Sequence, residues 1–362
     1  MNATDVVLDI VSKNGNGMFL YAMFACEQLK CCVSPSEAEI QVQKLEFSMD
    51  EEYVNYFSTL QKEFPILYVC ALAPILASRV PLPEMVWNKI IFKALSNTFP
   101  KRDGSKLMDY QISLEFKTKI KQPFIGLLDF EDGIVAVLHK SMDGFLRMTP
   151  SSKTPIHLQI DVQIGHELIS KVVMDDDFEN EENKKNAATA QHFISAHSIY
   201  HHMKAKNTEQ AINWVLNLDK LMTSIYASKM DSNFERLVDD VQLLIDKEQL
   251  NEENLSFIKY GLSLLQLSKK CLMFDPRQFA GQILGRSMIP PFDRNQEYWV
   301  NEAKEWLKRT NLKVYVPKPF GRSGLSPAGT GLLKIIQGHS DTVRSVAISQ
   351  DGSFIVTGSD GE

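Results

Sequence analysis

Residues 338–360 read GHSDTVRSVAISQDGSFIVTGSD and carry the clearest structural signal in the chain. Val346 and Ile348 alternate with smaller side chains, which places both on one face of a β-strand. The turn residues Asp351-Gly352 follow, and the run 354–357 is again β-branched and aromatic. The pattern therefore predicts a short C-terminal β segment with a hairpin. The predicted strands are 332–336, 343–349 and 354–357.

The order of side chains in this stretch closely resembles the first half of a WD repeat, the unit from which one class of β-propeller is built. In that family the His of a Gly-His pair, a Ser or Thr on the next inner strand and an Asp in the following turn share one set of hydrogen bonds. The resemblance implies structural hydrogen bonds at His339, Thr357 and Asp360. It also implies protein partners bound through a propeller. The alternative is an unrelated β-hairpin.

The Trp-Asp pair that ends a WD repeat is absent from residues 332–362. One blade needs about 40 residues, and a propeller needs at least about four blades. We therefore expect residues 332–362 to be a first, incomplete WD repeat and the sequence to be a fragment.

Most of the chain before residue 313 has helical periodicity, so the expected fold class is mainly α. Between residues 49 and 148, helical segments are followed by short strand-like runs, with a turn signal at Asp132-Gly133. Helices followed by a small hairpin predict a winged-helix unit. The expected helices are 17–29, 49–64, 66–77, 83–95 and 141–146, and the expected strands are 110–116, 124–130 and 134–138.

The chain from residue 157 to residue 310 predicts a series of helices with short polar breaks. No motif recurs at a fixed spacing, so the helices are expected to stack as a solenoid-like array or an irregular bundle. The expected helices lie near 159–174, 187–204, 207–228, 231–248, 251–273, 275–287 and 293–309. The Pro- and Gly-rich stretch 313–331 predicts a linker.

Three further stretches resemble one family, in the order in which that family carries them. Residues 12–22, SKNGNGMFLYA, resemble the segment after the ATPase core of NACHT-type NTPases. Residues 139–146, HKSMDGFL, resemble the end of their winged-helix domain, with Gly144 where an Asp is expected. Residues 274–286, FDPRQFAGQILGR, resemble the helical segment before the propeller. Together with the WD repeat, these stretches make the chain similar to STAND-class P-loop NTPases with NACHT and WD-repeat domains.

This resemblance implies a domain order and a signalling function. The function would be to couple ligand sensing at the propeller to nucleotide-dependent assembly, with a homo-oligomer of the full-length protein as the product. The alternative is a nucleotide-independent scaffold of helical array and propeller. The implied domains are a helical lid at 1–48, a winged helix at 49–148, a helical connector at 149–312, a linker at 313–331 and the incomplete WD repeat at 332–362.

The sequence contains no Gly-x4-Gly-Lys-Ser/Thr loop, no Gly-x-Ser-x-Gly elbow and no kinase signature. We therefore expect no enzyme activity and no cofactor in this chain, whereas ATP or ADP would bind to a full-length parent. The resemblance makes His139 a candidate contact for the β-phosphate of ADP in such a parent. The alternative is a structural histidine beside the predicted wing.

Four histidines lie on one predicted helix: His192, His197, His201 and His202. His197 and His201 are four residues apart and share a face, which could suit zinc. Structural zinc sites need four ligands, and no further ligand follows at a suitable spacing. The pattern therefore favours a histidine-rich surface helix and no metal site.

Composition and charge limit the partner classes. The 362 residues include 39 basic and 45 acidic side chains, and a net charge of −6 gives no general attraction to nucleic acid. A local basic stretch at 101–121 favours DNA binding, but acidic residues interrupt it, so we do not expect nucleic acid as a partner.

Cysteine usage and the apolar runs indicate a cytoplasmic protein. The 5 cysteines are odd in number and include no CxxC pair, which favours free thiols. The N-terminus lacks the basic region of a signal peptide. The longest apolar run, Ile66 to Ala77, is too short to cross a bilayer and contains Pro74, so no membrane partner is expected.

Overall fold

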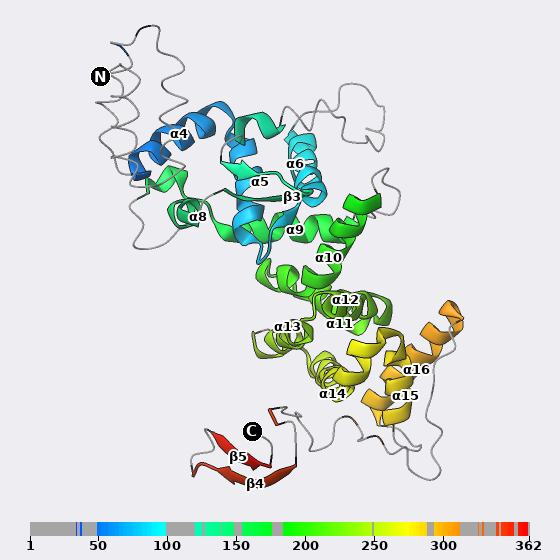
Figure 1. The fold of residues 1–362 in the computed structure, drawn as a ribbon. Helices are drawn as coiled ribbons and strands as arrows, with labels where there is room; N and C mark the ends of the chain where they lie inside the picture. Colours follow the sequence, from blue (N-terminus) through cyan, green and yellow to red (C-terminus); the bar gives the residue numbers. More distant parts are fainter. Residues whose placement is uncertain are drawn as a thin grey trace. The chain divides into compact units, whose positions relative to one another are not determined.

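The structure is a computed structural model and is mainly helical, as the sequence predicts (Figure 1). Its residues divide into two compact units, 1–214 and 215–362. The residues that the structure describes are 34, 37, 49–98, 120–124, 127–138, 140–147, 154–175, 184–247, 250–287, 293–311, 325, 328, 338–339, 342–350 and 354–360. The expected helix at 17–29, the expected strands at 110–116 and 332–336, and most of the expected linker lie outside them.

The first unit contains helices with three short strands between them. Its elements are α4 (Met49–Glu63), α5 (Pro65–Ala77), β1 (Leu82–Pro83), α6 (Glu84–Thr98), η1 (Gln122–Phe124), β2 (Leu128–Asp129), β3 (Ile134–Val137), α8 (Lys140–Leu146), η2 (Ile156–Leu158), α9 (Val162–Asp175), α10 (Lys184–Lys204) and α11 (Thr208–Leu216).

The predicted hairpin at Asp132-Gly133 is confirmed. Asp132 and Gly133 have φ values of 53° and 74°, and Ile134 N donates to Glu131 O at 3.0 Å. Two successive positive φ values are those of a type I′ turn, which explains the Asp-Gly pair. β2 and β3 pair antiparallel across this turn, but β2 is shorter than the strand expected at 124–130. Phe124 instead ends the 3-10 turn η1.

A third strand, β1, was not foreseen. The pattern predicted Pro83 as the first helical residue, whereas Pro83 pairs with Ile134 of β3 and α6 begins at Glu84. The sheet order is β1-β3-β2, so β1 is an edge strand. Proline has no N–H to donate and is therefore tolerated at such an edge. Pro83 is therefore extended rather than helical because it pairs with β3, a strand distant in the sequence.

The core of the first unit forms around α5, which is apolar on almost every side. Residues 70–77 of this helix are all buried. Helices α4, α6 and α9 pack against it (Figure 1). Trp87 Nε1 donates to Ala71 O at 2.8 Å, and Tyr68 Oη donates to Leu158 O at 2.7 Å. Both polar groups are therefore satisfied inside the core.

Helix α9 approaches α5 at Gly165. A Cβ added at Gly165 would lie 2.0 Å from Ala73 O and 2.7 Å from Ala77 Cβ. Helix α10 packs in turn on α9 and α6. Helices α9 and α10 therefore belong to the same compact unit as α5. The domain boundary expected between residues 148 and 149 stays a prediction.

The second unit consists of helices and a C-terminal hairpin. One helix expected near 207–228 is two, because the Asn217 side chain accepts from Lys220 N at 3.1 Å and caps a new helix. The segment expected at 275–287 begins as a 3-10 turn. The elements are α12 (Leu218–Met230), α13 (Phe234–Lys247), α14 (Glu252–Phe274), η3 (Pro276–Gln278), α15 (Phe279–Arg286), α16 (Arg294–Thr310), β4 (Val343–Ile348) and β5 (Ile355–Ser359).

Helices α14 and α16 meet closely at Gly261. A Cβ there would lie 2.4 Å from the Trp299 ring, and Trp299 Nε1 donates to Phe257 O at 3.0 Å. The Phe257 and Tyr298 rings stack with centroids 4.5 Å apart. These contacts bury Trp299 completely.

The predicted C-terminal hairpin is present. β4 and β5 pair antiparallel, with Val346 opposite Thr357 and Ile348 opposite Ile355. Val346 and Ile348 therefore share a face, as their alternation predicts. Within the described parts of the chain, no helix has both the length and the apolar character needed to cross a membrane.

We predict that Gly165→Ala destabilises the first unit by about 1–3 kcal/mol, the usual cost of overpacking a core. The added methyl group must displace α9 from the backbone of α5. Urea unfolding, with hydrogen exchange of residues 65–77 as the local readout, measures this loss.

The matched control is Gly144→Ala, because a Cβ at Gly144 of α8 meets nothing within 4 Å. Stability of this variant should be unchanged or raised by up to about 1 kcal/mol, since alanine favours a helix over glycine. Equal effects of the two substitutions would contradict the close approach of α5 and α9.

Candidate functional site

The C-terminal hairpin brings together two of the three residues to which the sequence assigned shared hydrogen bonds. His339 Nε2 lies 2.6 Å from Thr357 Oγ1. Asp360 makes different contacts: its Oδ2 accepts from Arg344 Nε at 2.7 Å, and its backbone N donates to Thr342 O at 3.1 Å. The structure thus pairs Asp360 with Arg344 and joins His339 to β5.

The hairpin exposes its apolar side chains. Val346 and Ile348 of β4 are 62% and 66% exposed, and Ile355, which lies opposite Ile348 on the same face, is 52% exposed. Contiguous exposed apolar surface of this kind is typical of a contact site for other polypeptide. Figure 1 shows β4 and β5 side by side.

His139, the candidate nucleotide contact, lies outside the described residues. The helix that follows it, α8, is anchored by an ion pair that the sequence reasoning missed. Arg147 Nε and Nη2 donate to the Asp143 carboxylate at 2.7 and 2.8 Å, and Nη2 also donates to Leu76 O at 2.7 Å. The i, i+4 spacing of Asp143 and Arg147 was the available signal. Gly144, where the resembled family has Asp, faces open space.

The expectation of a histidine-rich surface helix is wrong. His197, His201 and His202 of α10 are all buried, and only His192 of the four is partly exposed. The physical reason is the packing of α10 against α9, α6 and β1. His201 Nδ1 lies 3.0 Å from Nδ1 of His166 on α9, so one imidazole donates and the other accepts.

The surroundings of this histidine pair favour neutral imidazoles. Burial first, then the positive charges of Lys204, Arg79 and Arg147, lower the pKa of His166 to about 4. Burial, then the neighbouring His166 and His197, hold the pKa of His201 well below its ordinary value. Among the described residues no group of three or more His, Cys, Asp or Glu side chains is placed to hold a metal ion. The pair is therefore a buried polar contact between α9 and α10.

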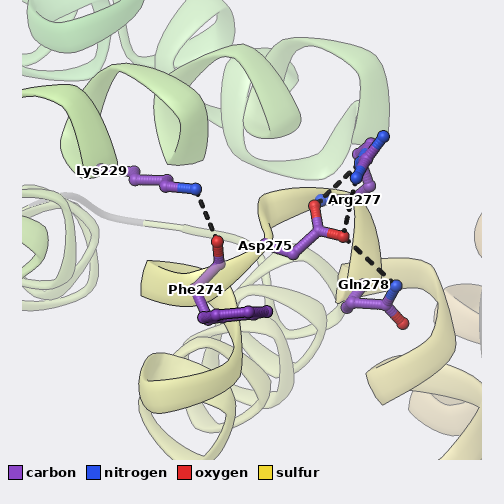
Figure 2. A network of polar contacts seen from close by, with 5 residues as sticks. All are labelled: Lys229, Phe274, Asp275, Arg277 and Gln278. Carbon is purple, nitrogen blue, oxygen red and sulfur yellow. Dashed lines mark hydrogen bonds and ion pairs between the residues drawn. The ribbon is translucent and has the colours of Figure 1, made fainter.

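The stretch that begins at Phe274 forms an ordered polar turn between α14 and α15 (Figure 2). The Asp275 carboxylate accepts from Arg277 N at 3.1 Å, from Arg277 Nε at 2.9 Å and from Gln278 Nε2 at 3.4 Å. The hydrogen bonds from the Arg277 side chain are the main reason that the pKa of Asp275 is lowered. Lys229 Nζ of α12 donates to Phe274 O, and this hydrogen bond links the turn after α14 to α12.

Comparison with known proteins identifies the hairpin segment. Residues 330–362 match the family described as WD domain, G-beta repeat. No curated protein and no solved structure matches the chain significantly. The match supports a WD-repeat protein, while the NACHT and STAND assignments stay predictions.

We predict that acid destabilises the first unit through the buried histidine pair. The pKa of His166 is about 4 in the folded chain against an ordinary value of 6.5, so the unfolded chain takes up the proton first. Stability should therefore fall as the pH drops from 6.5 toward 4, by up to about 1.4 kcal/mol per pH unit for each such histidine.

Urea unfolding at pH 7, 6 and 5 measures this dependence. His166→Gln should flatten the curve, whereas the matched change His157→Gln should leave it unaltered, because His157 is exposed. A wild-type curve that does not change over this range would contradict the prediction.

Proposed function

We propose that this chain, which carries a WD repeat at residues 330–362, is the regulatory and protein-interaction segment of a NACHT/WD-repeat signalling NTPase. The match to the WD domain is the observation that carries the proposal. WD repeats typically mediate contacts between proteins, and the exposed side chains of β4 and β5 offer an apolar surface for such contacts.

The nucleotide-coupled part of the proposal is supported by the order of three sequence motifs and by two features of the fold. The three motifs at 12–22, 139–146 and 274–286 stand in the order of the resembled family. The first unit combines helices with a small antiparallel sheet and a tight hairpin, the combination from which a winged helix was predicted. Residues 274–278 form a defined turn rather than an open loop.

The proposed mechanism is allosteric and involves no reaction in this chain. Partner capture at the propeller would favour an open, assembling state of the full-length protein, and ADP at the NTPase core would favour the closed state. This chain would supply the packed helices that transmit the change and, through His139, a contact to the bound nucleotide. ATP and ADP would bind to the parent protein.

We predict that charge on the exposed face of the hairpin abolishes partner capture. In quantitative proximity labelling, the double variant Val346→Asp and Ile348→Asp should label its specific partners at least tenfold less than the unchanged chain does. The reason is that charges cannot enter an apolar contact without a large desolvation cost. Lys308→Glu on α16 is the control, since Lys308 is exposed on a helix outside the hairpin. An unchanged partner set in the double variant would overturn interaction through the WD segment.

We also predict that the purified chain binds neither Mg-ATP nor ADP at millimolar concentration in calorimetry, because it lacks a phosphate-binding loop.

When the chain is joined to an upstream NTPase core, the His139→Ala variant should release ADP faster than the unchanged protein. A parent transcript without any P-loop, or unchanged ADP retention, would favour the nucleotide-independent scaffold.

A further inference from the structure

Figure 2 shows the Phe274 ring on a turn that also carries Arg277, with Lys229 reaching this turn from α12. Phe274, at the end of α14, is 85% exposed, and Met230, at the end of α12, is 75% exposed. Tyr226 on α12 is also exposed and lies close enough to Arg277 and Asp275 to interact with their charges. We call this surface the basic–aromatic patch; its residues are Tyr226, Lys229, Met230, Lys270, Phe274 and Arg277.

The backbone of Phe274 is held in place although its side chain is free of the core. Its carbonyl oxygen accepts from Lys229 Nζ, and the next residue, Asp275, donates its backbone N to Cys271 O at 2.8 Å. The Asp275 side chain then holds Arg277 and Gln278, and Pro276 is buried. Because the backbone at Phe274 is already fixed, covering the ring costs side-chain conformational freedom only, which lowers the cost of binding.

Exposure of this ring forgoes a substantial stabilisation. Burial of a Phe side chain stabilises a fold, and the helical unit buries Phe234, Phe257 and Phe279. Aromatic side chains and Arg are the residue types enriched at the centres of protein interfaces. The patch therefore has the composition of a binding anchor.

Charge defines the kind of partner. Arg277 is paired with the Asp275 carboxylate, and Lys229 and Lys270 add two positive charges beyond this ion pair. Lys270 lies one helical turn before Phe274. The neighbouring Lys269 is neutralised by its ion pair with Glu235. A nucleic acid would need a far larger basic surface than three cations, and the whole chain carries a net charge of −6.

We propose that the basic–aromatic patch is a docking site for an acidic peptide segment that carries an aromatic side chain. The ring of the peptide packs on Phe274 and Met230, and its carboxylates pair with Lys229, Lys270 and Arg277. This site is separate from the WD segment and does not depend on the function proposed above.

Fluorescence anisotropy with the full chain and a labelled peptide, EEDFEDEE, tests the proposal. We expect binding at 50 mM salt that weakens steeply by 300 mM salt, and at least tenfold weaker binding of EEDAEDEE. Phe274→Ser should also weaken binding at least tenfold, and Lys270→Glu at least threefold. Phe274 is exposed, so its substitution should leave the unfolding midpoint unchanged.

The control is Lys259→Glu, which makes the same charge change at an exposed position of α14 three turns away. No binding of EEDFEDEE at 1 mM would overturn the proposal, as would equal losses in Lys259→Glu and Lys270→Glu. A concentration-dependent dimer in analytical ultracentrifugation that Phe274→Ser abolishes would overturn it in favour of a second copy of the chain as the occupant.

Discussion

The burial of α5 is the constraint on which the first unit depends. This helix has no polar face, so each of its sides must be covered by another element. Helices α4, α6 and α9 supply the cover, and β3 adds a further contact. Gly165 lets α9 approach the α5 backbone closely. The side chains of Trp87 and Tyr68 donate hydrogen bonds to backbone oxygens within the same core. The sheet and the histidine-rich helix are arranged around this centre.

Polar caps organise the second unit. Asn217, Asn251 and Asp293 each accept a backbone N–H at the start of a helix, and Asp275 does the same for the turn after α14. Each cap satisfies a backbone N–H in the first turn of its helix, which has no partner within the helix. The residue before Asp275, Phe274, keeps its ring outside the core.

The WD segment contains contacts that were predicted before the structure and one that was not. Its turn, alternation and His339–Thr357 contact all join residues fewer than twenty positions apart. Turn chemistry and periodicity predicted the first two, and the resemblance to a WD repeat implied the contact. The resemblance assigned Asp360 to the same set of hydrogen bonds as His339, whereas the structure pairs its carboxylate with Arg344.

The sequence alone determined the mainly helical class, the hairpin at Asp132-Gly133, the C-terminal hairpin with its apolar face, and the WD repeat. These features depend on periodicity and turn chemistry, which act between neighbours in the chain. Only the tertiary structure decided that Pro83 pairs with Ile134, that α10 buries His197 and His201, that Gly165 admits α9 to α5, and that Phe274 stays exposed. Each of these depends on which distant element covers a given face, and residue order does not specify that cover.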